Sequence, residues 1–341
     1  MNRPKPRRRS QIERYELHRS PLAQKPTQKA LAELLGLKRD KLRALATYKE
    51  AYIVRRTELI GHKVRDLAYP KGELRTVHEK LKFHLNKVKQ PDYLISPRTG
   101  MSQRENARIH LGQRQYFSFD LKQFYPSTTR THVFNWLKRR LNMLDDVAGL
   151  AAQLVTVDDI VSFGSPLTPV LCSLVHRQMF DAIASQCAKR GLRISLWVDD
   201  VVISGNFVPG VLVSEIRQIV RSNGLRTHKL EYRTGNRPVT ITGLLVHRGR
   251  VDAPLSLHRR IQAGYLEVRR APDGDTSQID QLLSSLGSYR YIVGPKTARG
   301  VKASAKMAAL RRRRIAATRR PASSLDAGLA IAAEDVPFDL D

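Results

Sequence analysis

The segment Ile194-Ser-Leu-Trp-Val-Asp199-Asp200-Val-Val-Ile-Ser204 places two adjacent carboxylates between two apolar, strand-like runs. This pattern predicts a β-hairpin with Asp199 and Asp200 at its tip. Two neighbouring acids repel each other and interrupt a hydrophobic hairpin, so folding alone gives no reason for them. A bound divalent cation does, because hard cations take carboxylate oxygens and cancel the repulsion. The alternative is a solvated turn.

Other acids in the chain differ in their surroundings. The pairs Asp145-Asp146 and Asp158-Asp159 are not framed by β-branched strands, and we expect both to face solvent. Asp120 ends the alternating run Tyr116-Phe-Ser-Phe-Asp120-Leu, which predicts a half-buried strand. If a shared sheet brings Asp120 beside the hairpin acids, the three carboxylates suit two-metal phosphoryl transfer, with metals about 3.5–4 Å apart.

Charge is the most unusual property of the composition. The chain has 341 residues, with 60 Lys and Arg against 31 Asp and Glu, a net charge of +29. Such a field is informative about partners, and nucleic acid is the expected one, because each neutralised phosphate releases counterions. An anionic membrane surface is the rival, but no apolar run approaches the roughly 20 residues that a membrane helix needs. We expect no membrane association.

Cysteine content and the N-terminus bear on the compartment. Cys172 and Cys187 are too few for a disulfide framework or a zinc cluster. The basic N-terminus is not followed by an apolar segment, so no secretory signal is expected. These features favour a reducing cytoplasm.

Periodicity predicts a mixed helix and strand content. Residues 28–47 predict two short helices broken at Gly36, either a packed helical pair at the edge of a domain or a DNA-binding helix-turn-helix. Residues 69–77 predict a basic turn, and a second strand pair is expected over 226–251 with a turn at Gly235-Asn236. Further helices are expected over 137–154, 170–189, 210–222 and 255–292.

Five segments are informative through their common order and spacing. They are Asn106-Ala-Arg-Ile-His110, Phe117-Ser-Phe-Asp-Leu-Lys-Gln-Phe-Tyr-Pro-Ser127, Gly164-Ser-Pro-Leu-Thr-Pro169, Trp197-Val-Asp-Asp200 and Ile241-Thr-Gly243. The second, third and fourth resemble palm motifs of reverse transcriptases. The first and fifth resemble the Asn-Ala-x-x-His and Val-Thr-Gly patterns of retron enzymes. From about residue 28 to residue 295 the chain therefore resembles a bacterial retron-type reverse transcriptase.

The resemblance implies an α+β right-hand polymerase with fingers, an antiparallel-sheet palm, a helical thumb and an N-terminal helical extension. The domains expected from it are a basic N-terminal segment at 1–27, N-terminal helices and fingers at 28–115, a palm with interleaved fingers elements at 116–252, an RNA-binding thumb at 253–320 and a flexible tail at 321–341.

The same resemblance implies a two-metal catalytic centre. Asp120 and Asp199 are expected to hold two Mg²⁺ ions, with Mn²⁺ as a substitute. Asp200 is expected to support them, and the carbonyl of Leu121 is a further expected ligand.

Nucleotide-binding roles also follow from the resemblance. Tyr125 occupies the place of a steric gate, where an aromatic ring excludes a ribose 2′-hydroxyl and favours dNTPs; core packing is the alternative. Lys71 and Arg75 correspond to basic residues of the fingers that hold the triphosphate. The segment that begins at Gly164 is expected to position template and nucleotide. Lys229 is the expected general acid for the leaving pyrophosphate.

RNA contacts are expected at two places. Asn106 and His110 lie one helical turn apart and are expected to face an RNA strand, with capping or core hydrogen bonding as the alternative. Arg311 and Arg312 belong to a run of four arginines that is expected to grip structured RNA, with a solvated tail of non-specific affinity as the alternative.

Three positions depart from the family pattern. Trp197 replaces the usual Tyr of the metal-binding motif, and Phe163 stands where Gln commonly precedes the glycine. Glu231 occupies the register of the pyrophosphate-facing Lys. Primer contact and nucleotide positioning are expected to differ accordingly.

In function, the resemblance implies an RNA-directed DNA polymerase that copies a dedicated structured non-coding RNA into single-stranded DNA covalently linked to that RNA. It further implies a priming 2′-hydroxyl on a guanosine and a role in phage defence with a separate effector protein. The alternatives are a non-retron defence or group II intron-like reverse transcriptase and, from another class, a catalytically silent protein that binds RNA or DNA.

Overall fold

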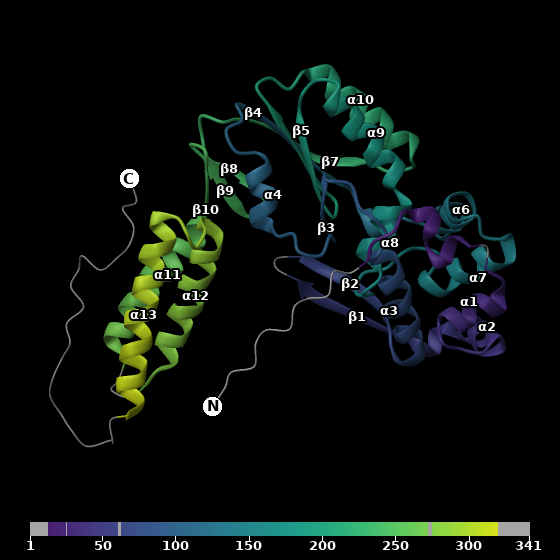
Figure 1. Cartoon of the computed structure of the whole chain (residues 1–341), viewed down its shortest axis with the longest axis horizontal. Coiled ribbons are helices and arrows are strands. Elements are labelled where there is room, and N and C mark those ends of the chain that lie inside the picture. Colours follow the sequence, from purple (N-terminus) through teal and green to yellow (C-terminus); the bar gives the residue numbers. More distant parts are fainter. Residues whose placement is uncertain (1–12, 25, 61–62, 272–274, 320–341) are drawn as a thin grey trace. The chain divides into compact units, whose positions relative to one another are not determined.

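The computed structural model describes residues 13–24, 26–60, 63–271 and 275–319 (Figure 1). The basic segment expected at the N-terminus lies partly outside these residues, and the tail expected at 321–341 lies wholly outside them. The chain forms two compact units. Of the described residues, the first comprises those within 13–101, 117–203 and 208–231, and the second comprises those within 102–116, 204–207 and 232–319. The domain boundaries expected from the sequence stay predictions.

A five-stranded sheet carries the hairpin acids. Its order is β3-β5-β6-β4-β7. The strands are β3 (Leu94–Ser96), β4 (Gln115–Leu121), β5 (Arg193–Trp197), β6 (Asp200–Gly205) and β7 (Thr227–Thr234). The strand that ends with Asp120 is thus hydrogen-bonded to the second strand of the hairpin, as predicted. The α+β class is confirmed, although the sheet is not wholly antiparallel, because β3 runs parallel to β5.

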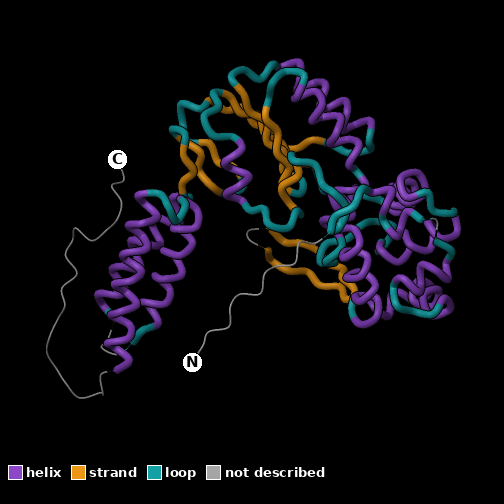
Figure 2. The backbone as a smooth tube through the Cα atoms, in the orientation of Figure 1, coloured by secondary structure: helices purple, strands orange, loops and turns teal. Residues whose placement is uncertain are grey.

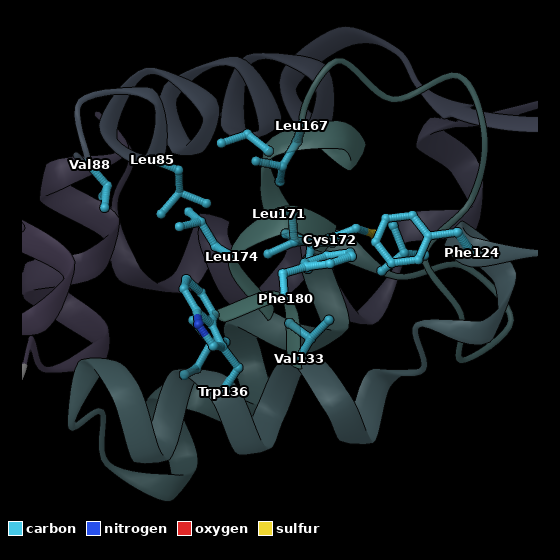
Figure 3. Packing of buried hydrophobic residues seen from close by; sticks show 14 of the residues in the cluster. Leu85, Val88, Phe124, Val133, Trp136, Leu167, Leu171, Cys172, Leu174 and Phe180 are labelled. Atoms are coloured by element: carbon cyan, nitrogen blue, oxygen red, sulfur yellow. The ribbon is translucent and has the colours of Figure 1, made fainter. Parts of the chain in front are cut away.

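The first unit has a helical core beside this sheet. The helix α9 packs against β5, and α10 packs beside α9 (Figure 1). Leu85, Trp136, Leu171 and Phe180, from four different helices, meet in one buried cluster (Figure 3). The helices of this unit are α1 (Gln28–Leu34), α2 (Arg39–Thr47), α3 (Gly72–Asn86), α5 (Phe124–Ser127), α6 (Arg130–Leu141), α7 (Asp145–Val155), α8 (Thr168–Val175), α9 (Arg177–Ala188) and α10 (Gly210–Ser222), with short 3-10 turns at Leu17–Arg19, Pro21–Ala23 and Lys49–Tyr52.

The helical pair α1–α2 is part of this core. Leu31, Leu42 and Leu45 are almost completely buried in the cluster. The chain turns between the two helices at Gly36, whose φ of +67° lies in the left-handed region that glycine adopts without strain. The packed-pair interpretation of residues 28–47 is therefore the one the structure supports.

A two-stranded hairpin in the first unit was not predicted. The strand β1 (Ile53–Ile60) pairs antiparallel with β2 (Lys63–Pro70), in a register that sets Arg55 opposite Ala68 (Figure 2). The sequence predicted only a basic turn from residue 69 onward. Charged residues recur along both strands, so neither has the clean alternation of a strand that buries one face.

The second unit combines a small sheet with a helical bundle. The antiparallel strands β8 (Val239–Ile241), β9 (Leu244–His247) and β10 (Arg250–Asp252) lie in the order β10-β9-β8, and α4 (Gln103–Ile109) packs against them. The helices α11 (Leu255–Arg270), α12 (Ser277–Val293) and α13 (Ala298–Arg319) pack side by side (Figure 1). In the described part of the chain no helix is long and apolar enough to cross a membrane.

A partly buried ion pair joins the small sheet to the bundle. The carboxylate of Asp252 accepts hydrogen bonds from Arg299 Nη1 and, at 2.8 Å, from the backbone N–H of Ala253. His258 Nε2 lies 3.5 Å from the same carboxylate. Burial raises the pKa of Asp252, but the hydrogen bonds from His258, Ala253 and Arg299 outweigh it and hold the pKa below its ordinary value.

This carboxylate gives the bundle a pH-dependent stability. Because the folded pKa of Asp252 is depressed, its contribution is fully present above the unfolded value of about 3.9 and is lost as the pH falls through the lower folded value. We expect Asp252→Asn to lower the free energy of unfolding by about 1.5–3 kcal/mol at pH 7 and much less near pH 2. Chemical unfolding of both proteins across this range measures the difference.

The control is Asp280→Asn in the same bundle. Asp280 pairs with Arg314 at 3.1 Å, and both side chains are about half exposed, at 47% and 49%. A surface pair of this kind contributes about 0–1 kcal/mol. A loss in Asp252→Asn that is the same at every pH would contradict the linkage.

Candidate active site

The tip of the predicted hairpin is strained. Strand β5 ends at Trp197 and β6 begins at Asp200, which confirms the hairpin. Between them Val198 has a φ of +61°, a left-handed conformation that a β-branched residue rarely adopts. The carbonyl of Asp199 accepts a hydrogen bond of 3.2 Å from the N–H of Leu121 at the end of β4. This bond ties the turn to the neighbouring strand, and such strain persists only where the surroundings impose it.

Asp120 lies within an electrostatic network. Its Oδ1 is 2.9 Å from His228 Nδ1, and its Oδ2 accepts a hydrogen bond of 3.0 Å from Lys229 Nζ, both from β7. The Asp120 side chain is only 17% exposed. Burial raises the pKa of Asp199, and the negative charge of Asp120 raises it further. The two carboxylates are therefore close enough to repel each other.

These carboxylates have the donor chemistry of a Mg²⁺ site. Both present hard oxygen atoms, and the ammonium group of Lys229 beside Asp120 partly offsets their repulsion. Asp200, at the start of β6, is exposed. Among the described residues no group of three or more His, Cys, Asp or Glu side chains is arranged to hold a metal ion. Asp120 and Asp199 thus fit as ligands by their chemistry, and Asp200 lines the same cleft, so its supporting role stays a prediction.

A cleft of about 1190 Å³ lies over the acids, entirely within the first unit. One part of its lining is acidic and includes Asp120, Asp199 and Asp200. The hairpin β1–β2 contributes Arg55, Arg56 and Arg65 to the lining, together with Asp66, and Arg55 pairs there with the lining residue Asp158. Leu121, Tyr125, Phe163, Trp197 and His228 complete the part of the lining that bears on function.

The basic residues at the cleft are not the ones predicted. Lys71 and Arg75 are absent from its lining; the backbone N–H of Lys71 bonds the carbonyl of Tyr52, and Arg75 Nη2 lies 3.7 Å from Glu79 Oε1. Their role in triphosphate binding stays a prediction. Arg65 was missed, although the apolar residues on either side of Arg65-Asp66 carry a weak strand signal. The arginines reach the cleft only because the hairpin forms.

The other predicted nucleotide-binding residues lie in or near the cleft. Tyr125 and Leu121 line it, and Lys229 is bound to Asp120. Gly164 follows the lining residue Phe163 and has a φ of +98°. A Cβ atom at Gly164 would lie 3.1 Å from Cβ and Cδ1 of Tyr69, so the loop needs glycine here both for its conformation and for its close approach to β2.

The two remaining Asp-Asp pairs are exposed, as predicted, although Asp158 also lines the cleft. Asp145 and Asp146 occupy the first turn of α7, where acids interact favourably with the helix dipole. Asp158 forms an exposed ion pair with Arg55 at 2.6 Å.

Asn106 and His110 were expected to face an RNA strand, but they do not, because both lie in the interior of the second unit. Both side chains are completely buried, and a buried side chain cannot reach a nucleic acid. Asn106 Nδ2 donates to Thr242 Oγ1 at 3.3 Å, and His110 Nδ1 lies 2.7 Å from Ser204 Oγ. The alternative of core hydrogen bonding is the one observed, and it joins the Asn-Ala-x-x-His segment to the Thr-Gly segment.

The arginine run divides between packing and exposure. Arg313 donates to the carbonyl of Val268, and Arg314, which is about half exposed, pairs with Asp280, so both contact neighbouring helices of the bundle. Arg311 and Arg312 are exposed on α13. Their contact with RNA stays a prediction.

Solved structures show weak likenesses to the chain. Apo telomerase from Candida tropicalis is 12% identical, covers 83% of this chain and 63% of its own, and has a TM-score of 0.46. Telomerase from Candida albicans, solved with a fragment of telomeric RNA, is 11% identical and has a TM-score of 0.41. The match covers 82% of this chain and 64% of the telomerase chain.

Curated relatives are more informative, although no protein-family model matches the chain. Retron Se72 reverse transcriptase of Salmonella heidelberg is 24% identical over 183 residues, 52% of this chain and 48% of the relative. Retron Ec86 reverse transcriptase of Escherichia coli is 23% identical over 225 residues, which are 64% of this chain and 69% of the relative. Retron Mx162 reverse transcriptase of Myxococcus xanthus is 21% identical over 313 residues, with the match covering 79% of this chain and 64% of the relative. The chain matches about half the length of the first. Together these relatives confirm the resemblance of the chain to bacterial retron-type reverse transcriptases.

Proposed function

We propose that the chain is an RNA-directed DNA polymerase whose reaction takes place in the cleft over Asp120 and Asp199. The observation that carries this proposal is that carboxylates and arginines line the same cleft. Two mutually repelling carboxylates lie at the junction of β4 and the β5–β6 hairpin, and arginines of β1–β2 contribute to the same lining. A nucleoside triphosphate needs both, since its phosphates require cations and its metal ions require carboxylates.

The proposed roles of the residues follow from the presence of carboxylates and arginines in one cleft. Asp120 and Asp199 would hold Mg²⁺, which when bound activates the primer hydroxyl and stabilises the charge that develops on the transferred phosphate. Arg65 would bind the triphosphate, since a guanidinium pairs with phosphate oxygens through a planar fork of donors. We assign the protonation of the leaving pyrophosphate to Lys229, whose ammonium group already lies beside Asp120.

Tyr125 is the proposed gate against ribonucleotides. Its ring is partly buried, lines the cleft and is close enough to Asp199 for that carboxylate to help raise its pKa, after the larger effect of burial. A rigid ring at this place leaves no room for a 2′-hydroxyl. We therefore propose dNTPs as the substrates.

The template proposed is a structured RNA. The net charge of +29 and the exposed Arg311 and Arg312 support binding to a folded RNA through phosphates and 2′-hydroxyls. The three relatives, all named retron reverse transcriptases, support the further proposal of a DNA product covalently linked to that RNA and of a role in phage defence with a separate effector. Sequencing the nucleic acid that co-purifies, with and without debranching treatment, tests the link; a linear DNA would point to another kind of reverse transcriptase.

Primer extension on an RNA template tests the polymerase activity itself. With Mg²⁺ and dNTPs we expect the wild type to extend the primer and Asp199→Ala with Asp200→Ala to leave it unextended. Equal, background-level incorporation by the two proteins would overturn the proposal and would favour a protein that only binds nucleic acid.

A further inference from the structure

Three side chains form a continuous stack in the lining of the cleft. The guanidinium carbon of Arg65 lies 4.8 Å from the centre of the Phe163 ring. The Phe163 ring in turn meets the Tyr125 ring edge to face, with centroids 5.0 Å apart and planes at 63°. Phe163 is therefore the middle member of the stack. It connects the arginine proposed to hold the triphosphate with the tyrosine proposed to exclude the ribose 2′-hydroxyl.

The backbone fixes Phe163 against the hairpin. Its carbonyl accepts a hydrogen bond of 3.1 Å from the N–H of Ala68, and Leu67 and Phe163 form a parallel β-bridge. The preceding residue, Ser162, donates its hydroxyl to the carbonyl of Ala68 at 2.5 Å. The loop that carries Phe163 thus lies alongside β2 and pairs with it through this single bridge. The backbone that carries the ring is therefore held against the strand on which Arg65 lies.

The ring of Tyr125 depends on the same contact. Tyr125 belongs to the short helix α5, and its chain neighbour Phe124 lies 5.8 Å away, centroid to centroid. Phe163 is closer and approaches from another part of the chain. Phenylalanine has neither a donor nor an acceptor, so it cannot bind a sugar hydroxyl by a hydrogen bond. It acts through its shape and the faces of its ring, and contacts of these kinds change an equilibrium by about 2- to 10-fold each.

We propose that Phe163 is a positioning residue for sugar selection: it sets how closely the Tyr125 ring approaches the nucleotide sugar and holds Arg65 over the same site. This proposal rests on the polymerase function proposed above. It makes triphosphate binding and discrimination between dNTPs and rNTPs two consequences of one stack. A substitution that removes the ring is then expected to weaken both together.

The test compares Phe163→Leu with Phe163→Tyr in steady-state incorporation of a dNTP and of the matching rNTP. Leucine keeps the apolar volume but removes the ring. We expect the ratio of kcat/KM for dNTP over rNTP to fall about 3- to 10-fold and KM for the dNTP to rise by a similar factor, with kcat nearly unchanged. Tyrosine keeps the ring and is expected to keep the wild-type ratio. Ile160→Val, in the same cleft but outside the stack, is the matched control.

A second comparison separates positioning from general damage. If Phe163 acts through Tyr125, then Phe163→Leu changes the dNTP to rNTP ratio in the wild-type background but not in Tyr125→Ala, because coupled residues are not additive. Partial misfolding would lower the active fraction for both nucleotides equally and leave the ratio unchanged.

The outcomes distinguish this inference from the function on which it rests. If the wild type incorporates no dNTP, both the polymerase function and the positioning role of Phe163 are wrong. An active wild type whose ratio is unchanged in Phe163→Leu removes the positioning role alone. So does a further fall of the ratio when Phe163→Leu is added to Tyr125→Ala.

Discussion

Replacing Asp120 by Asn is expected to reduce primer extension by about 10³-fold or more, the largest effect anticipated for any single residue here. The substitution is nearly isosteric but removes the charge that would balance a divalent cation. It also removes the charge that attracts Lys229, which lies 3.0 Å away, and His228. Asp199→Asn is expected to be comparably severe, since Asp199 is the second carboxylate over which the cleft lies.

The measurement is single-turnover extension of a primer annealed to RNA, with the folded fraction of each variant checked by thermal unfolding. Asp145→Asn serves as the control, because Asp145 is exposed in the first turn of α7 and pairs with Lys138. It is expected to cost about 0.3–1 kcal/mol of stability and little activity. An Asp120→Asn protein that is folded and retains a tenth of the wild-type rate would contradict the assignment of Asp120.

Replacing Tyr125 by Ala is expected to lower the preference for dNTPs over rNTPs by about 10- to 100-fold. The partly buried ring lines the cleft close to Asp199, and its removal opens space where a 2′-hydroxyl would otherwise clash. The change is expected mainly through faster use of rNTPs. Incorporation of dNTPs should fall less, since the acids and Arg65 remain in place.

Competition between a dNTP and its rNTP in one reaction measures this preference directly. Tyr125→Phe is the matched control: it keeps the ring and loses only the hydroxyl, so it is expected to retain the preference. An unchanged ratio in Tyr125→Ala would return Tyr125 to the alternative of simple core packing. A ratio lost equally in Tyr125→Phe would show that the hydroxyl, and not the size of the ring, discriminates.

The β5–β6 hairpin could be predicted from the sequence because its signals are local. Adjacent acids between two β-branched runs have few explanations, and the turn forms where the pattern changes, between Trp197 and Asp200. The same local argument correctly assigned Asp145-Asp146 and Asp158-Asp159 to solvent. Burial and charge pattern over a few residues were sufficient in each case.

The basic side of the cleft could not be predicted in this way. Arg55 and Arg65 lie on a ribbon whose strands carry charges along their length, so periodicity did not reveal it, and a chain with 60 Lys and Arg offers many rival candidates. What brings Arg65 to the site is the pairing of Ala68 with Phe163, a contact between residues far apart in sequence. The stack of Arg65, Phe163 and Tyr125 has no counterpart in any local pattern.

Asn106 and His110 were expected from the sequence to contact RNA, but the tertiary structure buries them. Their helical spacing was visible in the sequence, but spacing does not say whether a helix face meets solvent or protein. Packing of α4 against β8–β10 buries both side chains and supplies Thr242 and Ser204 as partners. The sequence by itself determined which residues are candidates for the chemistry, through short-range patterns of charge and hydrophobicity. Only the tertiary structure decided which of them share a cleft and which are buried, because long-range pairing and burial depend on the whole folded chain.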